Sequence, residues 1–123
     1  MNKISISSDG LSVRFTRTEK LAGLVGDVHV PLHQINSVSV VDDGLAAARG
    51  LRAPGLGVPG RRKIGTWRRR GQGRTLVDVR RGQPALSLEL NDHHYARLLI
   101  GAPDAASLTD RINSSLRAAA SAG

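Results

Sequence analysis

Glycine residues with the spacing of a phosphate-binding loop lie in an arginine-rich segment, RGLRAPGLGVPGRRKIGTWRRRG, at residues 49–71. Residues 55–60 match the pattern G-x-G-x-x-G, in which backbone amides at a helix N-terminus bind a pyrophosphate. Here the motif follows Arg-Ala-Pro and precedes an extended basic stretch, and Pro59 removes one of its amides. We therefore interpret these glycines as turn residues in a connection over residues 44–60, and we expect no dinucleotide or other cofactor.

The arginines around this motif could contact an anion. From Arg49 to Arg81 the chain has eleven basic residues and one acidic residue, a local charge of +10; the remainder has seven basic and nine acidic residues, which gives the overall +8. A charge excess confined to one stretch indicates either an anionic partner or a solvated face. The candidate contact residues are Arg61, Arg62, Lys63, Arg68, Arg69, Arg70, Arg74, Arg80 and Arg81.

Two interpretations of this basic stretch stay open. A charged strand edge protects a sheet against aggregation, and the same row of arginines can bind an anionic surface. Apolar residues beside it, Leu51, Leu56 and Val58, either fold back over the core or enter a membrane interface.

Other residue types give no pattern for catalysis or metal binding. Cysteine is absent, and no nucleophile elbow, paired-carboxylate site or H-E-x-x-H motif occurs. His29 and His33 have helical metal-ligand spacing, but Pro31 predicts an extended segment, in which they would be ~13 Å apart. His93 and His94 lie in a predicted turn. We expect no metal site and no enzymatic activity.

The elements that would position the arginines are mostly strands, because apolar and polar residues alternate with period two. Turn signals such as Ser8-Asp9-Gly10, Asp42-Asp43-Gly44, Gly71-Gln72-Gly73 and Gly82-Gln83-Pro84 separate them. The predicted strands cover residues 4–6, 11–15, 28–31, 38–40, 62–69, 75–80, 86–90 and 97–100. A short helix is predicted over residues 19–24.

After Pro103 the period changes. Leu108, Ile112 and Leu116 recur every four residues, which predicts an amphipathic helix from about Asp104 to Arg117 with a frayed tail at residues 119–123. No βαβ alternation occurs, so we expect antiparallel sheets. The predicted fold is a single mainly β (α+β) domain over residues 1–123, with about seven strands in two near-orthogonal antiparallel sheets and one C-terminal helix.

Within residues 62–69, alternation directs one central pair to the core, either Ile64 and Thr66 or Gly65 and Trp67. Trp67 is the better candidate because it buries ~200 Å². With Trp67 inside, Arg62, Arg68 and Arg70 would share the outer face, with Lys63 and Arg69 at the rims.

The chain resembles bacterial pleckstrin-homology-like proteins, in particular small actinobacterial ones. The resemblance depends on VPLHQI (30–35), SVSVVD (37–42), RAPG (52–55), GTW (65–67) and VRRGQPA (79–85), together with Pro59-Gly60 and YARL (95–98). It extends over roughly residues 11 to 117 and implies a barrel of two sheets closed by a helix. It also implies a binding or assembly module without catalysis.

Lipid-binding members of that superfamily carry basic residues on their first hairpin. Lys63, Arg68 and Arg70 mimic that motif in the second half of the chain, whereas the first hairpin here holds Ser8-Asp9-Gly10. Phosphoinositide recognition is therefore not carried over from the resemblance.

We expect a non-enzymatic interaction module that binds a partner protein, or itself, through the basic strand and an exposed sheet edge. An anionic membrane surface is the second expected partner. Nucleic acid is the alternative from another class, and the three aromatic residues disfavour base stacking. The N-terminal sequence MNKISISSDG has no apolar signal region and no span of ~18 apolar residues occurs, so we expect a cytoplasmic protein, with peripheral contact at the inner membrane face as the second expectation.

Overall fold

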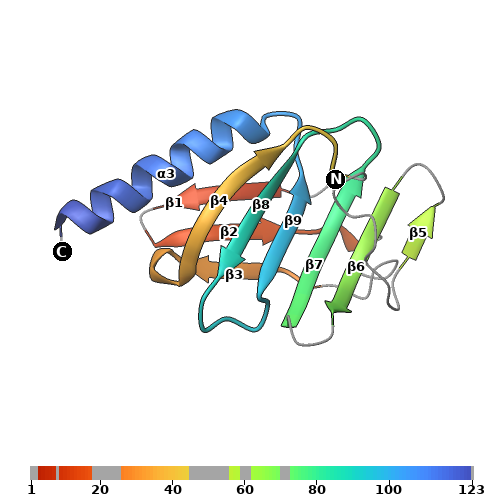
Figure 1. Ribbon diagram of the computed structural model, residues 1–123, viewed down its shortest axis with the longest axis horizontal. Helices are drawn as coiled ribbons and strands as arrows, with labels where there is room; N and C mark the ends of the chain where they lie inside the picture. Colours follow the sequence, from red (N-terminus) through yellow and green to blue (C-terminus); the bar gives the residue numbers. More distant parts are fainter. Residues whose placement is uncertain are drawn as a thin grey trace.

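The computed structural model describes residues 3–7, 9–17, 26–44, 56–58, 62–69 and 73–122 (Figure 1). In this part of the chain, nine strands form a three-stranded and a six-stranded sheet, and one long helix follows the last strand. The predicted mainly β class, with two sheets and a C-terminal helix, is confirmed. The predicted helix at residues 19–24, Leu51 and most of the turn at residues 71–73 fall outside the described residues.

The smaller sheet is an antiparallel meander of β1 (Lys3–Ser7), β2 (Gly10–Arg14) and β3 (Val28–Pro31). The predicted N-terminal hairpin is confirmed, because Ser7 pairs with Gly10 across the turn at Asp9. Pro31 lies on β3, an edge strand, which is where a residue without a backbone N–H is tolerated in a sheet. A single 3₁₀ turn, η1 (Leu32–Gln34), then leads into the second sheet.

The larger sheet has the order β4-β8-β9-β7-β6-β5. Its strands are β4 (Ile35–Val41), β5 (Leu56–Val58), β6 (Arg62–Arg69), β7 (Gly73–Arg80), β8 (Ala85–Leu90) and β9 (Arg97–Gly101). The prediction missed β5, which is three residues long and lies in the segment interpreted as a connection without strands.

The prediction that every pair of neighbouring strands is antiparallel is wrong for β7 and β9, which are parallel. β9 lies between β7 and β8 and pairs antiparallel with β8. The turn between β7 and β8 accepts two backbone hydrogen bonds, from Ala102 N–H to the carbonyl of Pro84 at 3.0 Å and from Gly44 N–H to the carbonyl of Gln83 at 2.9 Å.

The helix α3 (Ala105–Ala122) packs against β4 and β8, and Figure 1 shows it running beside β1. Leu108 and Ile112 are buried in the core, as their spacing predicted. The predicted frayed tail is wrong up to Ala122, because the helix continues through AAASA. Alanine has the highest intrinsic helix propensity, which favours this extension.

Aliphatic side chains from both sheets and from α3 form one core, with Phe15 as its only aromatic residue among the buried, described residues. A second cluster, Val77, Val79, Ala85 and Leu99, lies on β7, β8 and β9 at alternate positions to the main core. The sequence-based prediction preferred Gly65 and Trp67 over Ile64 and Thr66 as the pair that faces the core. This preference is wrong for Ile64, which is 2% exposed and belongs to the main core. Arg62 and Arg68 are an even number of residues from Ile64 along β6, so their positions fall on the same face of the strand as Ile64.

Candidate interaction surfaces

The first candidate surface is the pair of strands β6 and β7, called the arginine ribbon below. Together they carry six basic residues and one acidic residue. The antiparallel register sets Arg62 opposite Arg80 and Arg68 opposite Arg74. The register therefore concentrates positive charge at both ends of the ribbon. Like charges directly opposite on neighbouring strands destabilise a sheet.

The nine predicted contact residues fall into three groups. Arg62, Lys63, Arg68 and Arg69 lie on β6, and their side chains are outside the described part of the structure. Arg74 and Arg80 lie on β7 and are partly exposed, and Arg81 is exposed in the turn that follows. Arg61 and Arg70 lie outside the described residues. The structure thus brings the members on β6 and β7 together on two paired strands.

Intramolecular contacts of the ribbon differ between its two ends. At one end, the Nη1 group of Arg74 donates a hydrogen bond to Nε2 of His94 at 2.8 Å. At the other end, Arg80 and Arg81 have no ion-pair partner among the residues that the structure describes. Asp78, the one carboxylate of the ribbon, is 3% exposed and already makes an interaction of its own. It is therefore not accessible at the surface.

The described part of the glycine motif is Leu56–Val58, which forms a strand. Gly57 lies in β5, directly opposite Lys63 of β6. The motif therefore contributes to a β-hairpin, whereas a pyrophosphate site requires a helix N-terminus after the glycines. The described residues on both sides of residues 59–61 are paired antiparallel strands, β5 and β6.

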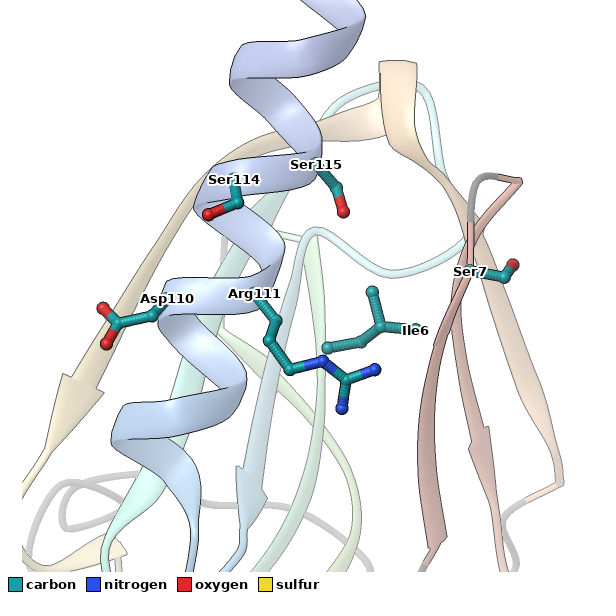
Figure 2. Close-up of a pocket in the computed structure, with 6 residues that line it drawn as sticks. All are labelled: Ile6, Ser7, Asp110, Arg111, Ser114 and Ser115. Carbon is teal, nitrogen blue, oxygen red and sulfur yellow. The ribbon is translucent and has the colours of Figure 1, made fainter.

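The second candidate surface, the β1–α3 groove, was not predicted from the sequence. It consists of two hollows in line along the junction of β1 with α3. One, of about 230 Å³, is lined by Lys3, Ile4, Leu108 and the residues at 101–104. The other, of about 440 Å³, is lined by Ile6, Ser7, Asp110, Arg111, Ser114 and Ser115 (Figure 2).

The charged wall of this groove is provided by the helix. Figure 2 shows Arg111 pointing from α3 toward Ile6, whereas Asp110, which also lines this hollow, projects from the helix in another direction. Arg111 is exposed and has no ion-pair partner among the described residues. The only sequence signal for this surface was the alternation of Ile4 and Ile6 on an N-terminal strand, which does not show what lies beside it.

The histidines link the two sheets. The Nε2 group of His93 donates to the carbonyl of His29 at 3.0 Å, and the N–H of Tyr95 donates to Nδ1 of His93 at 3.1 Å. These contacts specify the Nε2–H tautomer of His93 and tie β3 to the turn before β9. Within the described ranges, no group of three or more residues has the arrangement of a metal site.

Comparison with protein-family models, with curated proteins and with solved structures finds no match to this chain. Of the helices in the described part of the chain, none is long and apolar enough to cross a membrane.

Proposed function

We propose that this protein is a non-enzymatic interaction module whose arginine ribbon binds an acidic surface of a partner protein. One observation carries the proposal: the β6–β7 register pairs arginine with arginine at both ends of the ribbon. That arrangement lowers the stability of the sheet unless a negative charge lies nearby. The carboxylate within the ribbon, Asp78, is buried and already has an interaction of its own, so acidic residues of a partner would add negative charge at the exposed ends of the ribbon.

The rest of the described molecule supports binding more than solubility as the role of these arginines. Elsewhere in the described part of the chain, Arg97 and Glu89 form an ion pair at 3.8 Å. Outside residues 49–81 the acidic residues slightly outnumber the basic ones. The positive charge is therefore concentrated where two long strands present it to a partner.

The resemblance to pleckstrin-homology-like barrels also favours a binding or assembly role. The parallel β7–β9 pair departs from the purely antiparallel sheets of that architecture. The proposal consequently depends on the ribbon itself and uses the resemblance only as support for a module without catalysis.

The test compares three anionic probes with the wild-type protein across a salt series: poly-L-glutamate, vesicles containing phosphatidylglycerol, and duplex DNA. The ribbon variant is Arg68→Gln/Arg74→Gln/Arg80→Gln. The control is Arg14→Gln/Arg97→Gln/Arg117→Gln, which removes three charges from exposed positions outside the ribbon. We expect poly-L-glutamate to bind at low salt, and the ribbon variant to lose at least tenfold more affinity than the control.

Equal losses in both triple variants would contradict a localised site and indicate non-specific attraction. Tighter binding of vesicles or DNA than of poly-L-glutamate, with the loss confined to the ribbon variant, would replace the acidic protein by that partner. For DNA, the salt dependence would also fall by about 0.9 in logarithmic slope for each phosphate contact removed.

A further inference from the structure

The strand β1 lies at the edge of its sheet. Among the strands of the described residues, it pairs with β2 alone. In an antiparallel pair, every second residue of an edge strand directs its N–H and C=O groups away from its partner. β1 has a single charged residue, Lys3 at its beginning, and then alternates isoleucine and serine. Most of this edge therefore lacks the charges that usually prevent a further strand from pairing.

The helix α3 runs alongside this edge, and the two elements match in length. Lys3 and Ile4 line the same hollow as Asp104 and Leu108, whereas Ile6 and Ser7 line the next one with Ser114. Four residue steps along β1 cover ~13 Å. Ten steps from Asp104 to Ser114 cover ~15 Å along the helix. The two hollows together extend over a length of β1 that matches about four extended residues.

The position of α3 decides what kind of occupant fits. If a second copy of the chain paired its own β1 with this β1, its β2 would lie on the outer side of the added strand, because β1 and β2 are paired in each copy. That β2 strand would have to lie where α3 forms the opposite wall of the groove (Figure 1). A single extended segment meets no such obstacle, because it has β1 on one side and the helix on the other.

The residues along the groove indicate the chemistry of the occupant. Ile4 and Ile6 are partly buried and pack against the core, so they offer two apolar contacts at alternate positions. Arg111 points toward Ile6 from the helix (Figure 2), and no ion pair within the described residues joins it to Asp110, which lines the same hollow. A guanidinium group without a carboxylate partner favours a carboxylate, which it can bind through two hydrogen bonds.

We propose that the β1–α3 groove binds an extended peptide segment of about four residues, which adds to β1 as a strand and places a carboxylate against Arg111. This inference depends on the proposed function only in treating the chain as a binding module. Its site lies on other elements than the arginine ribbon, so each site can fail without the other.

The test selects linear peptides from a random library displayed on phage, with the wild-type protein as bait. A selected peptide is then measured against Arg111→Gln and against Arg117→Gln, a matched variant on the same helix that does not line the groove. A variant of the peptide that carries N-methyl groups at alternate residues tests the strand pairing. Amide hydrogen exchange of residues 3–7 locates the binding.

We expect the selected peptides to share an acidic residue among alternating apolar ones. Peptide binding should slow the exchange of β1 amides. Arg111→Gln should lower the affinity for the peptide at least tenfold, in line with the loss of a charge-assisted hydrogen bond. Arg117→Gln should change the affinity for the peptide less than twofold. N-methylation of the peptide edge that faces β1 should abolish peptide binding.

Failure to enrich any peptide would contradict the inference, as would equal losses in Arg111→Gln and Arg117→Gln. Protection confined to other strands would also contradict it. A further outcome is that the ribbon variant Arg68→Gln/Arg74→Gln/Arg80→Gln loses peptide binding while Arg111→Gln keeps it. This would assign the peptide to the ribbon. It would contradict peptide binding in the groove and support the proposed function.

Discussion

The arginine ribbon and the β1–α3 groove are both strand surfaces, but their energetics differ. The ribbon pairs like charges across two strands, with Arg68 opposite Arg74, and its carboxylate is buried. The groove combines two partly buried isoleucines with the cations Lys3 and Arg111 and the carboxylates of Asp104 and Asp110. Charge provides most of the attraction at the ribbon, whereas backbone pairing and shape would provide most of it at the groove.

This difference shows how one small domain can separate attraction from selectivity. Interactions between exposed charges are screened over ~8 Å at physiological salt, so contact at the ribbon should weaken steeply as salt rises. Strand pairing is much less sensitive to salt, because its hydrogen bonds join neutral groups. The two surfaces can therefore be distinguished by salt alone, and the following changes sharpen the contrast.

The largest effect is expected from Gly10→Ala in the sheet that carries β1. Gly10 has φ of 148°, and a Cβ atom there would lie 2.2 Å from the backbone oxygen of Val30. We expect a loss of about 3 kcal/mol in the free energy of unfolding, from the strained φ together with the clash. Denaturant unfolding measures it. Gly26→Ala is the control, since its Cβ would meet no atom within 4 Å.

An equal loss in the two glycine variants would show that β2 and β3 do not approach as closely as described. Under native conditions, binding of poly-L-glutamate at the ribbon should be the same for folded Gly10→Ala and wild type, because no residue of the ribbon contacts Gly10 in its register.

A gain of about 1 kcal/mol is expected from Thr109→Val on α3. The hydroxyl of Thr109 is buried without a hydrogen-bond partner, and the residue is 9% exposed. Valine keeps the shape and removes the unsatisfied group, so the helix wall of the groove should become more stable. Thermal unfolding measures the gain, and Ser114→Ala on the exposed part of the same helix is the control. A loss of stability in Thr109→Val would imply a partner for the hydroxyl.

The smallest effect is the repulsion between Arg68 and Arg74. A double-mutant cycle with Arg68→Gln and Arg74→Gln should give an unfavourable coupling of about 0.5 kcal/mol at low salt, which decreases as salt rises. Urea unfolding at two salt concentrations measures it. A favourable coupling would mean that the ribbon is stabilised within the molecule, which would remove the main argument for an acidic partner.

Much of the strand content followed from local patterns. Alternation placed β6 and β7 almost to the residue, and the four-residue spacing of Leu108 and Ile112 identified the buried face of α3. The short strand β5 was missed because three residues with a central glycine carry no periodic signal. The choice of Trp67 over Ile64 for the core was based on size, and Ile64 shows that size alone does not decide which face is inside.

The chain by itself determined where positive charge accumulates, which segments extend and which segment forms the last helix, because these depend on residue types and on periods of two and 3.6 residues. Only the tertiary structure decided that β9 enters between β7 and β8, and that β1 lies beside a helix about one hundred residues away in the chain. Pairing between distant segments depends on how all apolar faces are buried together. For that reason the groove, unlike the ribbon, became visible only in three dimensions.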